Sequence, residues 1–371
     1  MQSEAQIEIA VEDLQISYGP VKVVGPVSFT VTRGEQLTLL GPSGCGKTST
    51  LRAIAGLEKP SGGAIRIGSK TMYDGAKGIN LPAEQRGLSM VFQSYAIWPH
   101  MTVFENVAYG LRVRNTDAAE LKQKVHYALD LVQMGQYADR NASQLSGGQQ
   151  QRVAVARACA FGATVLLFDE PLSNLDAKLR AEMRIELREL QRRLKVTSVY
   201  VTHDLEEALA MSDQIIVMRG GHIEQRGSPS EIYNYPRTAF VADFVGSANL
   251  IGGRLRPELS GNGLVALDSA GGHLIYGTAH GRTPTADPVM SVRTVHLHLA
   301  AAPPAANGTD GRNVWPVTVK RSIFLGDMTQ LHVDWGGREV VIRQTASKQW
   351  QAGQQAYLSA APEHCVLLEA G

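Results

Sequence analysis

Residues 36–56 read QLTLLGPSGCGKTSTLRAIAG, and this stretch decides the fold of the first part of the chain. Leu37–Leu40 is a leucine-rich run of strand length, and Gly41–Thr48 fits the pattern G-x-x-x-x-G-K-[ST]. A helical pattern follows from Thr48 to Gly56, which is the context that this kind of loop requires. The stretch therefore predicts a strand, a loop that binds phosphate groups, and a helix.

The residue types of this loop suit phosphate chemistry. Glycines let backbone N–H groups close around the phosphates, and the positive end of the following helix faces the same point. Lys47 supplies a mobile positive charge, and Thr48 supplies a hydroxyl oxygen for magnesium. The alternative is a glycine-rich turn that matches by chance, and the motif alone does not separate a kinase, a GTPase and an ATPase. The expected nucleotide-binding residues are Gly41, Pro42, Ser43, Gly44, Cys45, Gly46, Lys47, Thr48 and Ser49.

Two acids end a second buried strand. The apolar run Val165–Phe168 is followed by Asp169 and Glu170. We expect both carboxylates at the C-terminal edge of the sheet, beside the phosphate-binding loop. Asp169 is expected to hold magnesium, and Glu170 to orient or deprotonate the attacking water. The alternative is an acidic pair that ends a strand and caps a helix.

Size and charge limit the possible partners. A chain of 371 residues favours two domains, each with its own core. Lys and Arg number 36 against 35 Asp and Glu, so we expect no nucleic-acid partner. Three widely spaced cysteines do not suit a disulfide framework and favour the cytoplasm. Residues 1–11 do not read as a signal peptide, and no apolar run approaches the ~20 residues that span a bilayer. A membrane role therefore requires a partner protein.

The sequence changes character along its length. Up to about Ser212, short apolar runs alternate with helical patterns, as in an α/β domain with a mainly parallel sheet. After Pro236, Gly and Pro become frequent, and alternating residues around Gly336-Gly337 predict a hairpin. We predict an α/β P-loop NTPase domain over residues 1–240, with a helical insertion at about 94–160, and a small β-barrel-like domain over 245–371.

A second anion-binding helix start is predicted at LSGGQ, residues 145–149. These residues open an Ala-rich helical stretch, and small residues at a helix start expose backbone amides. One chain then carries two helix N-termini that are suited to bind phosphate but only one P-loop. Ser146, Gly147, Gly148 and Gln149 are therefore expected to bind a nucleotide held by a second copy. The alternative is an ordinary N-cap by Ser146 followed by flexible glycines.

Together these motifs resemble those of the nucleotide-binding subunits of ABC transporters, and they occur in the same order. LSGGQ is the signature motif of that family. The resemblance implies that the nucleotide is ATP, that Tyr18 stacks on adenine, and that Gln93 links magnesium to a permease. It also implies that His203 contacts the γ-phosphate and that Ser173–Asp176 form the D-loop. Read singly, Tyr18 is a strand aromatic, Gln93 a solvated loop residue and His203 a strand-end cap. The expected catalytic residues are Glu170, His203 and Gln93, and the expected magnesium ligands are Thr48, Gln93 and Asp169.

The stretch from Val91 to Leu111, followed by QLSGGQQQRVAVARA and by the stretch from Val199 to Tyr233, looks most like the branch that serves maltose, polyamine, ferric iron and sulfate importers. That branch carries a C-terminal domain, so residues 245–371 are expected to form an OB-like, TOBE-like regulatory domain. The chain departs from it at SVRTVHLHL, where relatives read closer to Arg-Pro-Glu. His296 and His298 lie there as H-x-H, and their alternation with apolar residues predicts the solvent face of one strand rather than a metal site.

The resemblance implies a homodimer that binds two ATP molecules and drives a permease at the cytoplasmic face of the inner membrane. A periplasmic solute-binding protein is implied as an indirect partner. The phrases SYAIWPHMTVFENVAYGL and VGSANLI favour ferric iron or polyamine as cargo. A permease-independent soluble ABC ATPase is the alternative, but it usually carries a coiled-coil insertion or a second ATPase. A P-loop kinase leaves LSGGQ unexplained.

The apolar loop Tyr95–Met101 predicts an exposed docking surface for the permease. The alternative is that Ile97 and Trp98 pack into the helical subdomain.

Overall fold

The computed structural model describes residues 6–281, 287–304, 312–346 and 349–369. The chain divides into two compact units, Met1–Pro229 and Ser230–Gly371, which we call unit 1 and unit 2. Within the described ranges, none of the helices is both long enough and apolar enough to cross a membrane.

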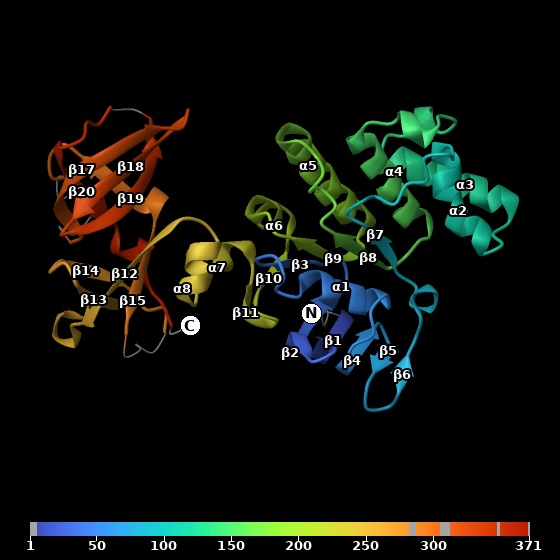
Figure 1. Cartoon of the computed structure of the whole chain (residues 1–371), viewed down its shortest axis with the longest axis horizontal. Helices are drawn as coiled ribbons and strands as arrows, with labels where there is room; N and C mark the ends of the chain where they lie inside the picture. Colours follow the sequence, from blue (N-terminus) through green and yellow to red (C-terminus); the bar gives the residue numbers. More distant parts are fainter. Residues whose placement is uncertain (1–5, 282–286, 305–311, 347–348, 370–371) are drawn as a thin grey trace, which may run out of the picture. The chain divides into compact units, whose positions relative to one another are not determined.

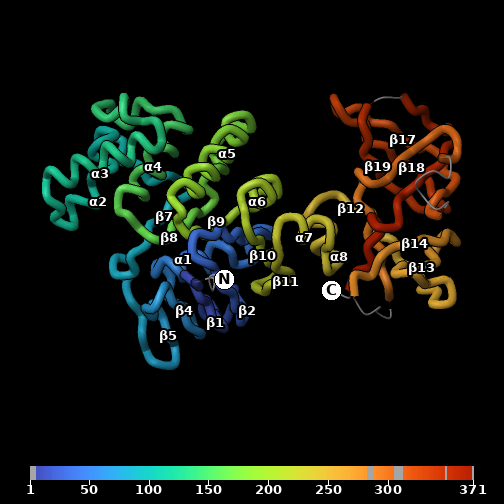
Figure 2. The backbone as a smooth tube through the Cα atoms, turned by 180° about the vertical axis from the view of Figure 1, so that it is seen from behind, coloured from blue at the N-terminus to red at the C-terminus, as the bar shows by residue number. Residues whose placement is uncertain are grey.

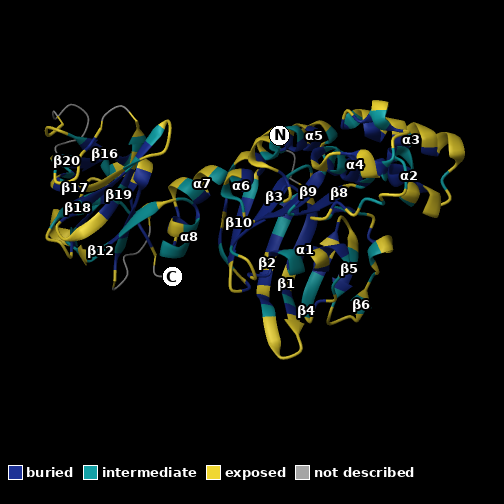
Figure 3. Ribbon diagram, turned by 45° about the horizontal axis from the view of Figure 1, so that its top comes forward, coloured by how far each residue is buried: buried dark blue, intermediate teal, exposed yellow. Residues whose placement is uncertain are grey.

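Unit 1 contains a six-stranded sheet in the order β11-β10-β3-β9-β8-β7 (Figure 1). Its strands are β3 (Gln36–Leu40), β7 (Ser89–Val91), β8 (Val165–Asp169), β9 (Thr197–Thr202), β10 (Gln214–Arg219) and β11 (His222–Gly227). All neighbouring pairs are parallel except β10 and β11. Every residue of β3, β8 and β9 is buried, as expected for parallel strands covered on both faces (Figure 3). The predicted α/β class is confirmed.

A second, antiparallel sheet of unit 1 has the order β2-β1-β4-β5-β6. It consists of β1 (Ile7–Tyr18), β2 (Val21–Thr32), β4 (Gly62–Ile67), β5 (Lys70–Asp74) and β6 (Ile79–Asn80). Its apolar face shares one core with β3 and with α1 (Lys47–Ala55). That core fixes the start of α1 relative to the end of β3.

A second core of unit 1 is helical. It joins α2 (Val103–Val113), α3 (Ala118–Leu131), α4 (Gly147–Ala160) and α5 (Ala177–Leu194), and α6 (Leu205–Met211) follows β9. Figure 2 traces the chain from β7 through α2, α3 and α4 and back into β8. On α5, Met183, Leu187 and Leu190 are buried and recur at steps of three and four residues, so this helix is amphipathic.

Unit 2 is built mainly of strands. A closed barrel is formed by β12 (Ala248–Leu255), β13 (Leu264–Ser269), β14 (Leu274–Thr278), β21 (Cys365–Leu367) and β15 (Val289–Arg293). A five-stranded sheet is formed by β16 (Leu297–Ala300), β20 (Gln355–Ala360), β17 (Val314–Phe324), β18 (Met328–Trp335) and β19 (Arg338–Thr345). The barrel and the sheet share one core. β18 pairs with β19 up to Trp335 and Arg338, so the hairpin predicted at Gly336-Gly337 is confirmed.

Arg293 at the end of β15 holds the segment that begins unit 2. Its Nη1 donates to the carbonyls of Ala242 and Gly246, both at 2.6 Å, and its Nη2 donates to the carbonyl of Tyr233 at 2.7 Å. These carbonyls lie at the ends of α7 (Pro229–Asn234) and α8 (Ala239–Phe244), where helices leave acceptors unpaired. Arg293 thus ties α7 and α8 to the strands of unit 2. The boundary between the compact units accordingly lies after Pro229, ahead of the change in composition that follows Pro236.

The histidines of the H-x-H stretch do not share one strand. His298 is exposed on β16, whereas His296 ends a 3-10 turn, is half-buried, and stacks on His364 with ring centroids 3.9 Å apart. Burial, with a smaller contribution from His364, lowers the pKa of His296. The prediction of a common solvent face is wrong for His296, because the turn interrupts the period of two. No group of three or more potential metal ligands occurs among the described residues.

A chain ending at Pro229 is expected to fold by itself, because both cores of unit 1 consist of residues from that unit. Urea unfolding followed by circular dichroism should give one cooperative transition. An insoluble or molten fragment would show that unit 1 depends on unit 2.

Candidate active site

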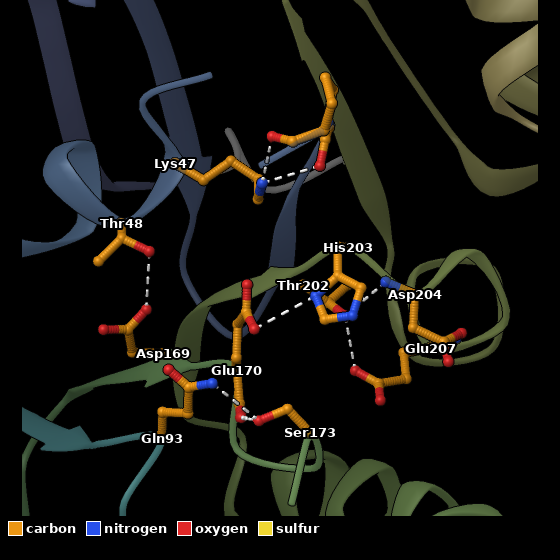
Figure 4. A network of polar contacts seen from close by, with 12 residues as sticks. Lys47, Thr48, Gln93, Asp169, Glu170, Ser173, Thr202, His203, Asp204 and Glu207 are labelled. Atoms are coloured by element: carbon orange, nitrogen blue, oxygen red, sulfur yellow. Dashed lines mark hydrogen bonds and ion pairs between the residues drawn. The ribbon is translucent and has the colours of Figure 1, made fainter. Parts of the chain in front are cut away.

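The loops that follow four neighbouring parallel strands converge at one edge of the sheet. β3 leads into the loop at residues 41–46, β7 leads to Gln93, β8 ends at Asp169 and leads to Glu170, and β9 leads to His203. Carboxyl ends of parallel strands lie at the same edge, where ligands of α/β proteins bind. Figure 4 shows the side chains that meet there.

The loop at residues 41–46 and the start of α1 form a cradle without side-chain caps. Gly46 is the N-cap of α1 with φ 97°, and no side chain bonds to the first-turn N–H groups. A Cβ atom on Gly41 would lie 2.4 Å from the carbonyl oxygen of Met218, so only glycine fits there. The Nζ of Lys47 donates to the carbonyls of Gly41 and Pro42 at 2.8 and 2.9 Å. Free amides at a helix start with a lysine beside them fit a phosphate group.

Cys45 lies inside this loop and is buried, and burial raises the pKa of its thiol. Only its backbone is therefore suited to contact a nucleotide.

Thr48 and Asp169 place two side-chain oxygen atoms next to each other at the end of β8. The hydroxyl of Thr48 donates to Oδ1 of Asp169 at 3.1 Å, and Nη2 of Arg52 lies 3.5 Å from Oδ2. Burial raises the pKa of Asp169, and the contacts from Thr48 and Arg52 partly oppose this shift. Hard oxygen donors beside a phosphate cradle fit Mg²⁺, which binds through one or two protein ligands and the phosphates of a substrate.

Glu170 faces His203 across the same edge (Figure 4). Their closest atoms, Oε2 of Glu170 and Nδ1 of His203, are 3.2 Å apart. Glu170 has φ 47°, a left-handed conformation that is strained for a glutamate. Its backbone is held because its N–H donates to Val201 at 3.1 Å and its carbonyl accepts from the hydroxyl of Ser173 at 3.0 Å. The strained backbone therefore belongs to the residue whose carboxylate contacts His203.

Gln93 contacts the segment predicted as the D-loop. Its Nε2 donates to Oγ of Ser173 at 3.2 Å, and Nδ2 of Asn174 donates to its carbonyl at 2.8 Å. These contacts join the end of β7 to the turn after β8.

Tyr18 lies beside the start of α1. Its exposed ring carries a hydroxyl 3.2 Å from Oγ of Ser49, and the same hydroxyl donates to Glu58. No sequence pattern pointed to Glu58, because its contact with Tyr18 joins two elements that are distant in the chain.

Ser146–Gln149 form the start of α4, away from this cluster. Ser146 caps the helix by accepting from the N–H of Gln149 at 3.4 Å, and the Gln149 side chain accepts from the N–H of Ser146 at 3.0 Å. In the described part of the chain, no hydrogen bond or ion pair joins these four residues to residues 41–49. The structure thus brings together all the predicted site residues except this group.

Comparison with known proteins identifies the family. The model of the ABC transporter family matches residues 24–173, and that of the TOBE domain matches residues 290–368. The Fe(3+) ions import ATP-binding protein FbpC of Photobacterium profundum is 42% identical over 95% of both chains. This chain belongs to the ATP-binding proteins of the ABC transporter family. It is therefore an ATPase that binds ATP.

Other proteins similar to this ABC ATPase support the same family assignment. FbpC of Brucella abortus is 44% identical over 88% of this chain and 87% of that protein. The sn-glycerol-3-phosphate import ATP-binding protein UgpC of Cupriavidus pinatubonensis is 39% identical over 98% of this chain and 97% of its own. The solved structure of cbiO1 from Clostridium perfringens, part of the transporter complex cbiONQ, has a TM-score of 0.56 at 28% identity. It covers 62% of this chain and 91% of that chain.

Proposed function

We propose that this ABC ATPase hydrolyses Mg²⁺-ATP at the converging strand ends and so energises import through a membrane permease. The observation that carries the proposal is the placement of Lys47, Asp169, Glu170 and His203 at one sheet edge (Figure 4). The protein would act peripherally at the cytoplasmic face of the inner membrane, with a periplasmic solute-binding protein as an indirect partner.

The proposed chemistry uses the chain's own groups. Lys47 and the first-turn amides of α1 bind the phosphates and balance their charge. The carboxylate of Glu170 accepts a proton from a water molecule while the oxygen of that water bonds to the γ-phosphorus. The bond between the γ-phosphorus and the bridging oxygen of ADP breaks. His203 donates a hydrogen bond to the γ-phosphate. The products are ADP and phosphate. Mg²⁺, held by Thr48 and Asp169 with Gln93 beside them, would neutralise phosphate charge when bound.

We propose a homodimer because, in the described structure, Ser146–Gln149 make no hydrogen bond or ion pair with the P-loop of their own chain. A second copy would bring this helix start to the nucleotide held by Lys47 and Thr48. ATP then favours the closed dimer only through its additional contacts in that state.

The proposed cargo is ferric iron, with a polyamine as the second candidate. The segments SYAIWPHMTVFENVAYGL and VGSANLI favour these two cargoes, and ferric iron is supported by the names of relatives that are 42 and 44% identical.

Cells that lack this chain should lose ⁵⁵Fe³⁺ uptake and regain it with the wild type but not with Glu170→Gln. Loss of ¹⁴C-spermidine uptake alone would indicate the polyamine, and loss of neither would contradict both cargoes. Normal uptake of all solutes would favour the permease-independent ATPase.

The proposed permease contact is the loop Tyr95–Met101. An exposed cluster was expected, but Tyr95 is buried in the helical core, Ile97 is half-buried against that core, and Trp98 is half-buried. The ring centroids of Trp98 and Tyr109 are 4.4 Å apart, and Cζ of Arg157 lies 5.0 Å from the centroid of the Trp98 ring. The Trp98 ring therefore packs against Tyr109 and Arg157, and its exposed part is the surface that we propose for the permease.

Trp98→Ala is expected to weaken capture of the permease about tenfold, because the loop loses its aromatic anchor while the P-loop is untouched. Pull-down of the cognate permease measures capture, with ATP affinity and melting temperature measured in parallel. His100→Ala, an exposed neighbour in the loop, serves as the control. Full capture by Trp98→Ala would contradict docking, and lost stability would favour packing alone.

A further inference from the structure

A buried carboxyl group that the proposed chemistry does not use lies behind His203. Glu207 in the first turn of α6 is 3% exposed. Its Oε2 accepts a hydrogen bond from the hydroxyl of Tyr200 at 2.9 Å. It also accepts one from the hydroxyl of Thr202 at 2.8 Å (Figure 4). Burial raises the pKa of Glu207, and the two hydroxyl hydrogen bonds oppose the shift. Burying such a group is unfavourable unless it is hydrogen-bonded, so its partners indicate why it is there.

Thr202 extends this contact to the backbone around His203. Its hydroxyl oxygen accepts a hydrogen bond from the N–H of Asp204 at 2.9 Å. A hydroxyl has one proton to donate, and Glu207 takes it, so the oxygen's lone pairs remain free for Asp204. The resulting turn spans His203. Asp204 closes the network by accepting from the N–H of Glu207 at 3.1 Å.

His203 depends on this turn because its side chain has little support of its own. The side chain is 56% exposed, and its contact with Glu170 at 3.2 Å is the one polar contact that it makes within the described structure. The direction of the ring is thus set by the backbone that carries it.

We infer that Glu207, acting through Thr202, positions His203 for its contact with Glu170 and the reacting phosphate. The inference rests on the proposed function, in which His203 contacts the γ-phosphate. Glu207 is a positioning residue, because its hydrogen bonds go to Tyr200, Thr202 and Asp204.

Steady-state hydrolysis of radiolabelled ATP by the purified full chain, which gives kcat and KM, tests this inference. Glu207→Met removes the acceptor at similar volume, and Thr202→Val removes the hydroxyl at constant shape. Each is expected to lower the hydrolysis rate about tenfold with the KM for ATP within about twofold. Glu207→Gln and Thr202→Ser keep an acceptor and a hydroxyl, so both should retain most of the rate. Tyr200→Phe is the matched control, because it removes the other donor to Glu207 and leaves the turn intact.

A second arm separates positioning from a general structural role. In a His203→Ala background, Thr202→Val should cause no further loss, because its effect acts through the missing ring. Multiplicative losses, or full rates in both Thr202→Val and Glu207→Met, would overturn the inference. If Glu207→Met does not fold, the Thr202→Val pair decides by itself. A wild-type rate for His203→Ala would instead overturn the role of His203 in the proposed function, and the inference with it.

Discussion

Replacing Glu170 by glutamine is expected to lower the rate of ATP hydrolysis on the order of 10²- to 10⁴-fold, the range that general base catalysis supplies. Glutamine keeps the shape of the side chain and can still accept a hydrogen bond from Nδ1 of His203, 3.2 Å away. It cannot take a proton from water at neutral pH. ATP affinity should remain close to that of the wild type, because Lys47 and Thr48 are unchanged.

The measurement is steady-state phosphate release with saturating Mg²⁺-ATP, together with equilibrium binding of a fluorescent ATP analogue. Glu182→Gln, an exposed acid on α5, makes the same chemical change outside the site and should leave both quantities unchanged. Hydrolysis by Glu170→Gln at the wild-type rate would remove Glu170 as the base. Loss of nucleotide binding would indicate that its left-handed backbone, rather than its charge, was disturbed.

The positions of the phosphate-binding loop and of the two acids could be predicted because local patterns record them, whereas Tyr18, Gln93 and His203 were expected at the site only through the family resemblance. Gly41–Thr48 directly follows one buried strand, Asp169 ends another and Glu170 follows it, and parallel strands bring their ends to one edge. The class of the first unit followed from the same alternation of strands and helices. The barrel of unit 2 was predictable for a similar reason, because short alternating segments and Gly336-Gly337 report the period of a strand.

The contacts between distant elements could not be predicted. Glu58 meets Tyr18 across 40 residues, and Arg293 reaches Tyr233 across 60. Such pairs are chosen by the packing of whole elements, which leaves no period in the sequence. The error over His296 has the same origin, since a three-residue turn between two strands looks like continued alternation. The packing of Trp98 against Tyr109 likewise depends on where α2 lies.

Gly46→Ala is expected to abolish ATP binding at millimolar concentrations and to lower the free energy of unfolding. Gly46 has φ 97°, where an L side chain costs about 1–3 kcal/mol. An added Cβ would also lie 2.7 Å from Cγ2 of Val24 and 3.1 Å from the carbonyl oxygen of Val23. Val24 is fully buried in β2 and cannot move aside cheaply, which adds about 1–3 kcal/mol of overpacking. Because Gly46 is the N-cap of α1, the displaced backbone would carry Lys47 and the phosphate-binding amides with it.

Gly44→Ala separates strain from collision within the same loop. Gly44 has φ 79°, but an added Cβ would meet no atom within 4 Å. This variant should therefore lose only the about 1–2 kcal/mol of a left-handed alanine and should still bind ATP. Chemical denaturation and ATP titration of both variants provide the comparison. Equal losses in the two would mean that backbone strain alone governs the loop. A larger loss in Gly46→Ala would show that close packing of the P-loop against β2 holds the phosphate cradle in its binding conformation.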